Sequence, residues 1–222
     1  MTTVISKATL QRLPIYLNCL KTADDASEYV SATTLANRLG FGEVQVRKDL
    51  ASICDAGKPK VGYLKKELVA VLENYLGADM NDAVLVGVGH LGKALMAYKG
   101  FEEYGFKIVA GFDVDPALIG RKVAGKEIFS ADRMETLIRR LHIRIGIITL
   151  PKEYAQETAD KLIQAGVRAI WNFSPTYIMV PDNVAVKNEN MASSLAVLVR
   201  QLKELSAAEK GSAAHKNEKE RG

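Results

Sequence analysis

The sequence predicts a mixed α/β protein with an N-terminal winged helix-turn-helix domain and a C-terminal Rossmann-like domain built on a parallel sheet. Two short amphipathic helices are separated by the glycine turn GFG at Gly40–Gly42, and a basic hairpin pattern follows them. Gly87, Gly89 and Gly92 stand in GxGxxG spacing directly after an apolar, β-branched stretch. Short apolar runs then alternate with helical patterns, as in βαβ units. The predicted domains are 1–78 and 79–188, followed by a helix over 189–206 and a disordered tail over 207–222.

Composition restricts the class of protein. The 222 residues are 48% hydrophobic and 25% charged, which is ordinary for a globular chain of one or two domains. No apolar run is long enough to cross a bilayer, and residues 1–20 lack the apolar centre of a leader, so we expect a cytoplasmic protein without membrane contact. Cys19 and Cys54 form no CxxC pair or cluster with histidine, and no metal is expected.

Positive charge gathers in one stretch of the chain. Residues 38–66 hold seven bases and three acids, an excess equal to the net charge of +4 of the whole chain. Such a local excess is typical of a surface that meets phosphates, and the alternative is a solvated helix face.

The first predicted helix carries leucine at a helical period. Leu10, Leu13, Leu17 and Leu20 predict one buried face. Pro14 lies among them and predicts a kink or the start of a new turn, because proline removes a helical hydrogen bond.

The two helices around the glycine turn predict a helix-turn-helix. Ser31 is a plausible N-cap of the first helix. In the second helix, Val46, Leu50 and Ile53 lie on one face, and the other face carries Gln45, Arg47 and Lys48, whose side chains can donate to base edges and phosphates. The alternative is a small helical bundle with a charged exterior.

The stretch GKPKVGYLKKEL predicts a basic hairpin directly after the second helix. A hairpin in this position is a wing, whose lysines would follow the phosphate backbone or enter the minor groove. The predicted contacts to double-stranded DNA are Ser31, Gln45, Arg47, Lys48, Lys58, Lys60 and Tyr63.

The glycine loop predicts a dinucleotide site. Gly87 permits the tight turn, Gly89 lets backbone approach the pyrophosphate, and Gly92 lets the helix pack on the strand. Asp113 ends the second predicted strand, 21 residues past Gly92, where an acid usually holds a ribose hydroxyl. This carboxylate favours NAD(H) over NADP(H). The alternative is a Rossmann-like domain that holds another nucleotide or coenzyme A.

Strands are predicted over 83–86, 106–115, 143–151 and 167–175. Open α/β sheets bind ligands at the carboxyl ends of their strands, so the ends of these strands should line the crevice. The predicted cofactor contacts are Gly87, Val88, Gly89, His90, Leu91, Gly92, Tyr98, Asp113, Val114, Thr149, Leu150, Pro151, Asn172, Ser174, Pro175 and Met191. Trp171 is expected in the core rather than as a stacking platform.

Catalytic residues are not apparent. None of the eight tyrosines has lysine four positions later, His90 lies inside the glycine loop, and little chain follows the last predicted strand. The sequence therefore predicts a binding protein and no enzyme, with an NAD-dependent oxidoreductase as the alternative.

The sequence resembles the Rex family of redox-sensing transcriptional repressors over roughly Ser6 to Leu205. The resemblance rests on LQRLPIYL, QVRKDL, VGY, GVGHLG, GFDVDP, LP followed by AQ, and NFSP, in this order. It implies a homodimer whose winged helices bind a palindromic operator and whose Rossmann domains sense the NADH/NAD⁺ ratio. NAD⁺ would permit DNA binding and NADH would release it. A C-terminal helix, here near Asn190–Leu205, would cross between subunits.

The resemblance also implies a set of switch residues. Tyr98 matches a tyrosine that changes position with the redox state of the nicotinamide. Arg12 matches an arginine that pairs across the dimer with an acid at the start of the C-terminal helix. This sequence departs from the family there, because Asn190 replaces that acid and Met191 stands where the family carries Leu or Phe against the nicotinamide. An amide is a poorer partner for Arg12 than a carboxylate, and the adjacent Glu189 is a substitute.

Overall fold

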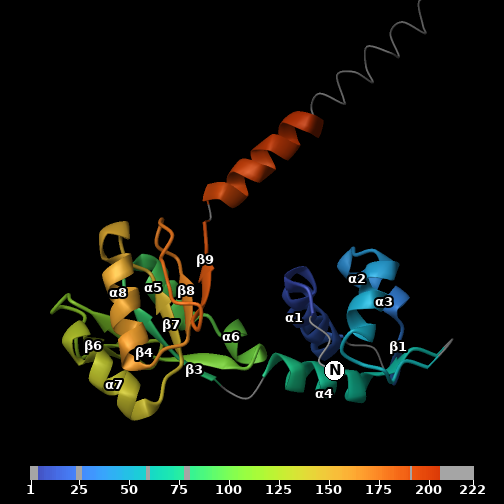
Figure 1. Cartoon of the computed structure of the whole chain (residues 1–222), viewed down its shortest axis with the longest axis horizontal. Coiled ribbons are helices and arrows are strands. Elements are labelled where there is room, and N and C mark those ends of the chain that lie inside the picture. Colours follow the sequence, from blue (N-terminus) through green and yellow to red (C-terminus); the bar gives the residue numbers. More distant parts are fainter. Residues whose placement is uncertain (1–4, 24–26, 59–60, 78–80, 191, 206–222) are drawn as a thin grey trace, which may run out of the picture.

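The computed structural model describes residues 5–23, 27–58, 61–77, 81–190 and 192–205. Figure 1 shows the described residues of 7–76 gathered into one body and those of 81–188 arranged around a single large sheet, from which a last helix points away. The buried residues follow this arrangement. One core joins elements between Leu13 and Leu72 in the N-terminal body, and two further clusters cover the faces of the sheet. Within the described residues, no helix is both long and apolar enough to cross a membrane.

The N-terminal body is a winged helix. Its elements are α1 (Lys7–Thr22), β1 (Tyr29–Val30), α2 (Ala32–Leu39), α3 (Glu43–Ala51), β2 (Tyr63–Leu64) and α4 (Lys65–Leu76). The helix-turn-helix is confirmed: Ser31 Oγ accepts a hydrogen bond from the Thr34 amide at the start of α2, and Gly40 ends α2 in the left-handed conformation. Apolar residues of α1, α2, α3 and α4 share one core.

Helix α1 runs through Pro14 as one element, with Leu13 and Leu17 buried in the core on either side of the proline. The expected burial of Leu10 is corrected. Leu10 is exposed, since the buried stripe begins instead at Thr9 and continues at Leu13.

The wing differs from the predicted simple hairpin. Lys58 and Gly62 exchange backbone hydrogen bonds of 2.9 Å across a tight turn. The chain that follows then pairs with β1, with Val30 opposite Tyr63, which the sequence did not indicate. Gly62 makes this approach possible, since its φ is +96° and a Cβ there would lie 2.4 Å from the carbonyl oxygen of Val30.

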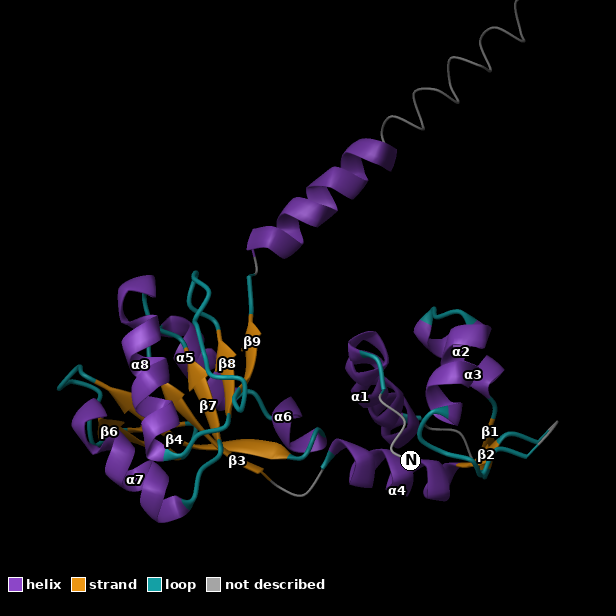
Figure 2. Ribbon diagram, in the orientation of Figure 1, coloured by secondary structure: helices purple, strands orange, loops and turns teal. Residues whose placement is uncertain are grey.

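The second body is a Rossmann-like sheet in the order β5-β6-β4-β3-β7-β8-β9, parallel except for β5 (Figure 2). Its elements are β3 (Asn81–Val86), α5 (His90–Ala97), α6 (Gly100–Glu103), β4 (Phe106–Asp113), β5 (Lys122–Val123), β6 (Lys126–Ser130), the 3₁₀ turn η1 (Ala131–Arg133), α7 (Met134–Leu141), β7 (Ile145–Ile148), α8 (Lys152–Ala165), β8 (Ala169–Asn172) and β9 (Ala185–Asn188). Strand β3 lies between β4 and β7, with Val86 opposite both Phe112 and Ile148. The strand order reverses there, which makes the carboxyl end of β3 the expected ligand crevice.

The four predicted strands are confirmed, although all but the first are shorter than expected. Strand β3 begins at Asn81, two residues before its predicted start, and residues 78–80 lie outside the described chain. The sequence did not indicate β6 or β9. Strand β9 lies at the edge of the sheet and is largely exposed, so it lacks the apolar pattern on which a strand prediction depends.

A helix over residues 192–205 follows β9 and points away from the sheet (Figure 1). Its large apolar side chains are exposed: Leu195, Val197, Leu198, Val199, Leu202 and Leu205. Asn190 caps it, since its Oδ1 accepts from the Ser193 amide over 2.9 Å. Met191 and the tail over 207–222 lie outside the described residues.

Candidate dinucleotide site and DNA-reading helix

The glycine loop connects β3 to α5, and two of its glycines are required by the protein itself. Gly87 has φ +96°, and a Cβ there would lie 2.7 Å from Leu150 Cδ2 and 2.9 Å from the Thr149 carbonyl oxygen. A Cβ at Gly92 would lie 2.2 Å from the carbonyl oxygen of Gly87. Among the described residues, a Cβ at Gly89 would meet no heavy atom within 4 Å. The loop therefore packs tightly against the protein at Gly87 and Gly92, and it has free space beside Gly89, where α5 begins.

Asp113 is fixed at the end of β4 beside this loop. Its Oδ2 accepts from the Val88 amide over 2.5 Å, and its Oδ1 accepts from the amides of Val114 and Asp115 over 2.8 and 2.9 Å. These bonds hold a half-buried carboxylate at the carboxyl end of the strand next to β3. The position and chemistry fit recognition of a ribose diol.

A cavity of about 790 Å³ opens at this edge of the sheet, a suitable size for a nucleotide. Seven of the predicted cofactor residues line it: Gly87, Gly89, Asp113, Val114, Thr149, Leu150 and Pro151. Sequence reasoning missed the other lining residues: Val86, Phe112, Ala131, Asp132, Met134, Glu135, Tyr154, Glu157, Thr158 and Lys161. Those from η1 and α7 follow β6, which was not expected, and those from α8 lie at helical spacing after Pro151, a pattern that could have indicated them.

The cavity is acidic. Asp113, Asp132, Glu135 and Glu157 contribute carboxylates, and the lining base Lys161 pairs with Glu157 over 2.7 Å. An extra phosphate on a ribose held by Asp113 would therefore meet like charge, whereas a free hydroxyl would not.

Other predicted cofactor residues do not line this cavity. The side chain of Val88 is fully buried, and Gly92 packs on the loop. His90 and Leu91 lie at the start of α5, and Pro175 is exposed beyond β8. Ser174 is 2% exposed, and its Oγ has no hydrogen-bond partner in the described part of the chain.

The predicted direct contact of Asn172 with the cofactor is corrected. Its side chain is completely buried, and its Nδ2 donates to the carbonyl oxygen of Thr176 and to Asn188 Oδ1, over 2.7 and 2.8 Å. Its Oδ1 accepts from the Ser174 amide over 3.0 Å. Asn172 therefore shapes the loop that leaves β8.

Tyr98 belongs to an aromatic cluster and does not line the cavity. Its ring lies edge-on to Phe101 with centroids 4.9 Å apart, and Phe101 contacts Trp171 with centroids 5.7 Å apart. Trp171 is half-buried, as expected of a core residue, and its Nε1 donates to Glu189 Oε1 over 3.0 Å. A contiguous set of side chains thus links the end of α5 to the segment before the C-terminal helix.

Helix α3 presents the predicted polar face. Gln45, Arg47 and Lys48 are exposed, while Val46 and Leu50 are buried on the opposite side. Arg47 also pairs with Glu43 one turn earlier on the same helix. Lys58 is exposed in the wing, and Lys60 lies outside the described residues. The predicted DNA contact of Tyr63 is corrected, because its side chain is 9% exposed and belongs to the core.

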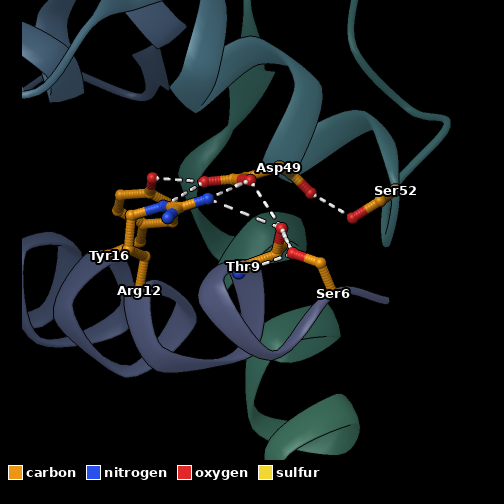
Figure 3. A network of polar contacts seen from close by, with 6 residues as sticks. All are labelled: Ser6, Thr9, Arg12, Tyr16, Asp49 and Ser52. Carbon is orange, nitrogen blue, oxygen red and sulfur yellow. Dashed lines mark hydrogen bonds and ion pairs between the residues drawn. The ribbon is translucent and has the colours of Figure 1, made fainter. Parts of the chain in front are cut away.

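A polar network that the sequence did not indicate joins α1 to α3 (Figure 3). Asp49 Oδ1 accepts from Thr9 Oγ1 over 3.0 Å and from Arg12 Nη2 over 2.8 Å. Asp49 Oδ2 accepts from Arg12 Nε over 2.7 Å and from the Tyr16 hydroxyl over 2.7 Å. Four donors therefore surround one carboxylate that is almost fully buried.

The network shifts the ionisation of its members. Burial alone would raise the pKa of Asp49, but hydrogen bonds from Arg12, Tyr16 and Thr9 outweigh it and hold the pKa below its ordinary value. Burial, together with the hydrogen bond to Asp49, raises the pKa of Tyr16 to about 12. The hydrogen bond to Asp49 also raises the pKa of Arg12. Arg12 thus has a carboxylate partner within its own chain.

An exposed basic recognition helix in a winged helix, followed by a nucleotide site in a Rossmann-like domain, defines a DNA-binding regulator that responds to a nucleotide. The family models agree: residues 4–51 match a putative DNA-binding protein N-terminus, and residues 79–176 match a CoA binding domain. The chain belongs to the Rex family of redox-sensing transcriptional repressors. The family is one of transcriptional regulators and not of enzymes, although dehydrogenases use the same kind of glycine loop.

Similar proteins and solved structures support the assignment to this family. The chain is 42% identical to the redox-sensing transcriptional repressor Rex of Treponema denticola over 86% of this chain and 91% of that protein. It is also 42% identical to Rex of Clostridium beijerinckii, over 90% and 96% of the two chains. The solved structure of RSP in complex with NAD⁺ and operator DNA matches with a TM-score of 0.85 and 35% identity, covering 94% of this chain and 97% of that one. RSP in complex with NADH matches with a TM-score of 0.82 and 35% identity.

Proposed function

We propose that the protein is a cytoplasmic repressor that binds a palindromic operator as a homodimer and leaves it when NADH binds. The observation that carries this proposal is that a single chain holds both an acid-lined cavity at the switch point of a Rossmann-like sheet and an exposed basic face on α3. The division into DNA-binding and dinucleotide-binding domains falls at residues 78 and 79. The protein binds the operator when it holds NAD⁺ or no dinucleotide.

The cavity takes the adenosine half of NAD(H). The pyrophosphate lies over Gly89 at the start of α5, where backbone amides and the helix dipole favour an anion. Asp113 holds the ribose hydroxyls, and Val114, Thr149, Leu150 and Pro151 enclose the nucleoside. The acids around the ribose exclude a 2′-phosphate, so NADH is preferred to NADPH.

The nicotinamide half lies towards the ends of β7 and β8. Ser174 and Pro175 follow β8, and Tyr98 ends α5. Oxidised nicotinamide is cationic and reduced nicotinamide is neutral, so apolar surroundings that include Tyr98 and Pro175 would prefer NADH. Met191, the third residue predicted to contact the nicotinamide, lies outside the described residues. A ligand shifts a conformational equilibrium only through its different affinities for the two states, and a nearly complete switch requires a ratio of about 10⁴.

The dimer supplies the geometry of operator reading. The exposed apolar residues of the helix over 192–205 are covered by a second subunit, which the helix crosses. The two α3 helices of the dimer then reach successive major grooves about 34 Å apart. In each groove the bases are contacted by Gln45, Arg47 and Lys48. The flanking DNA backbone is contacted by Ser31, Lys58 and Lys60. Arg12, Tyr98 and Asn190 are the residues through which the subunits respond to the nicotinamide.

The test is fluorescence anisotropy with an operator duplex recovered by selecting random-sequence DNA with the wild-type protein. We expect micromolar NADH to release the duplex and NAD⁺ at the same concentration to leave it bound. Release by both forms, or by neither, contradicts the redox-sensing part of the proposal.

Because residues 79–176 match a CoA binding domain model, coenzyme A is a second candidate ligand. Thermal denaturation separates the two, since a ligand raises the midpoint only if it binds the folded state. We expect NADH to raise the midpoint and coenzyme A to leave it unchanged. Stabilisation by coenzyme A alone would assign the site to that ligand instead.

A further inference from the structure

Asp49 occupies an unusual place on the DNA-reading helix. It lies on the buried side of α3 between Val46 and Leu50 and is 4% exposed, although it directly follows the exposed bases Arg47 and Lys48. An unpaired carboxylate at such a position would cost several kcal/mol. Within the described residues, the donors to its carboxylate all belong to α1, so Asp49 joins the reading helix to the first helix of the domain (Figure 3).

The contacts of Asp49 are directional. Arg12 binds it with two nitrogens, at 2.7 and 2.8 Å, in the planar fork that arginine forms with a carboxylate. The hydroxyls of Tyr16 and Thr9 bind the two oxygens separately, over 2.7 and 3.0 Å. A carboxylate with this set of donors tolerates little rotation, whereas the apolar contacts of Val46 and Leu50 are non-directional and allow α3 to turn about its axis.

Rotation of α3 matters because of where its bases project. Arg47 is two residues before Asp49 and therefore points roughly 200° around the helix from it. A turn of the helix that leaves Val46 and Leu50 buried would still displace the guanidinium of Arg47 sideways. Base recognition depends on two hydrogen bonds in a fixed plane, and a displacement of this kind removes them while leaving contacts to phosphate possible.

We propose that Asp49 is a positioning residue that fixes the rotation of α3 and thereby sets the discrimination between operator and other DNA. The inference rests on the proposed DNA-binding function. A buried ion pair contributes little net stability compared with apolar residues of similar size, and directional specificity is a role for which such pairs are retained in some proteins. The Arg12–Asp49 pair therefore affects the orientation of α3 more than the stability of the domain.

The test replaces the pair by apolar residues of similar volume, Arg12→Met with Asp49→Leu, in the full chain. The matched control is Lys21→Met with Glu73→Leu, which removes an ion pair of 2.7 Å that joins α1 to α4 and does not involve α3. Each variant is titrated against the operator duplex selected with the wild-type protein and against a scrambled duplex of the same composition, at one salt concentration. NADH affinity and the thermal midpoint are measured in parallel.

We expect the Arg12→Met/Asp49→Leu variant to remain folded and to keep its NADH affinity, with a thermal midpoint lowered only by the loss of the hydrogen bonds that Tyr16 and Thr9 donate to Asp49. Its ratio of operator to scrambled affinity should fall about tenfold or more, the loss of one base-reading contact. The control variant should keep the wild-type ratio. An unchanged ratio in the folded double variant overturns the proposal, as does an equal fall in the control.

A second variant covers the case in which the double variant does not fold. Arg12→Lys keeps the charge beside Asp49 and removes the planar fork, so the domain remains paired. We expect an intermediate fall in discrimination for Arg12→Lys, and a wild-type ratio would again overturn the proposal. Failure of this inference is distinguishable from failure of the proposed function, because in the latter the wild-type protein itself would select no operator.

Discussion

The carbonyl oxygen of Gly87 lies so close to Gly92 that a Cβ at position 92 would be 2.2 Å from it. This contact closes the turn between β3 and α5, and it involves no ligand. Position 89, three residues earlier in the same loop, is open on the side away from the protein. The two glycines therefore have separable roles, although both belong to one sequence motif.

Substitution of these two glycines by alanine should give different phenotypes. Gly92→Ala must displace backbone and should cost about 1–3 kcal/mol of stability, as overpacking does. Gly89→Ala meets no atom of the described chain and its φ of −71° suits alanine, so stability should not change. If the pyrophosphate lies at Gly89, NADH binding weakens in both variants. Urea unfolding and NADH titration measure the two effects, and a stable Gly92→Ala variant would contradict this account of the loop.

Asp113 should determine the choice between NADH and NADPH. The wild-type carboxylate repels a 2′-phosphate, so the wild-type protein should bind NADH much more tightly than NADPH. Asp113→Asn loses the charge and keeps one acceptor oxygen, which can still accept from the Val114 and Asp115 amides, while the bond from the Val88 amide to the second oxygen is lost. We expect the NADH preference to fall by about tenfold, equivalent to about 1.4 kcal/mol. Competition titration measures the ratio, with Asp160→Asn on the exposed face of α8 as the control.

Much of this fold followed from local signals in the sequence. Three such signals lie close together in the sequence: the GxGxxG spacing, the β-branched strand before it and Asp113 after it. The structure shows a steric or electrostatic reason for each of them. Strand β9 and the pairing of β1 with β2 depend on partners distant in sequence and have no apolar period of their own. Tertiary hydrogen bonding determines such elements.

The site was predictable to a similar degree. The exposed face of α3 followed from helical periodicity, because the apolar residues Val46 and Leu50 are four positions apart and leave the polar residues on the other side of the helix. Asp49 could not be assigned this way, since an acid on the buried side of a helix breaks the period, and its partners Thr9 and Arg12 are about forty residues away. The buried Tyr63 was misjudged for a related reason: its basic neighbours suggested exposure, whereas its pairing with Val30 buries it.

The Asp49 network should give the protein two pH limits. The pKa of Asp49 is lowered by folding, so its stabilisation is complete above the ordinary value of 3.8 and is lost as the pH falls through the lower folded value. The pKa of Tyr16 is raised from 10.0 to about 12, so its stabilisation is complete below pH 10 and is lost as the pH rises towards 12. Urea unfolding across pH measures both limits. Asp49→Asn should flatten the acid limit and Tyr16→Phe the alkaline one; wild-type slopes in these variants would exclude the network as the cause.

Trp171 should couple the dinucleotide site to the C-terminal helix. Its indole contacts Phe101 on one side and donates to Glu189 on the other. Trp171→Phe keeps a ring in the cluster and removes the donor. We expect NADH affinity to stay within about threefold while the effect of NADH on DNA affinity decreases, since coupling energies of 1–3 kcal/mol depend on such contacts. The control is Phe173→Leu, because the Phe173 ring packs against Trp171 with centroids 4.6 Å apart and has no hydrogen-bond donor to lose. Unchanged coupling in Trp171→Phe would remove Trp171 from the path.

Asn190 stands where the family resemblance implies an acid, and the structure shows what the amide does in this chain: it caps the C-terminal helix through the Ser193 amide. Asn190→Ala should therefore destabilise that helix by about 1 kcal/mol and weaken the dimer that we propose the helix forms. Asn190→Asp keeps the cap and adds a charge. If Arg12 needed an acid from the partner subunit, the aspartate variant would form a tighter dimer than the wild type. Because Asp49 already binds Arg12 with both oxygens, we expect the asparagine and aspartate proteins to dimerise equally in sedimentation equilibrium, and only the alanine variant to dissociate at higher concentration. A tighter Asn190→Asp dimer, abolished by Arg12→Met, would instead show that Arg12 exchanges its partner within the chain for one across the dimer.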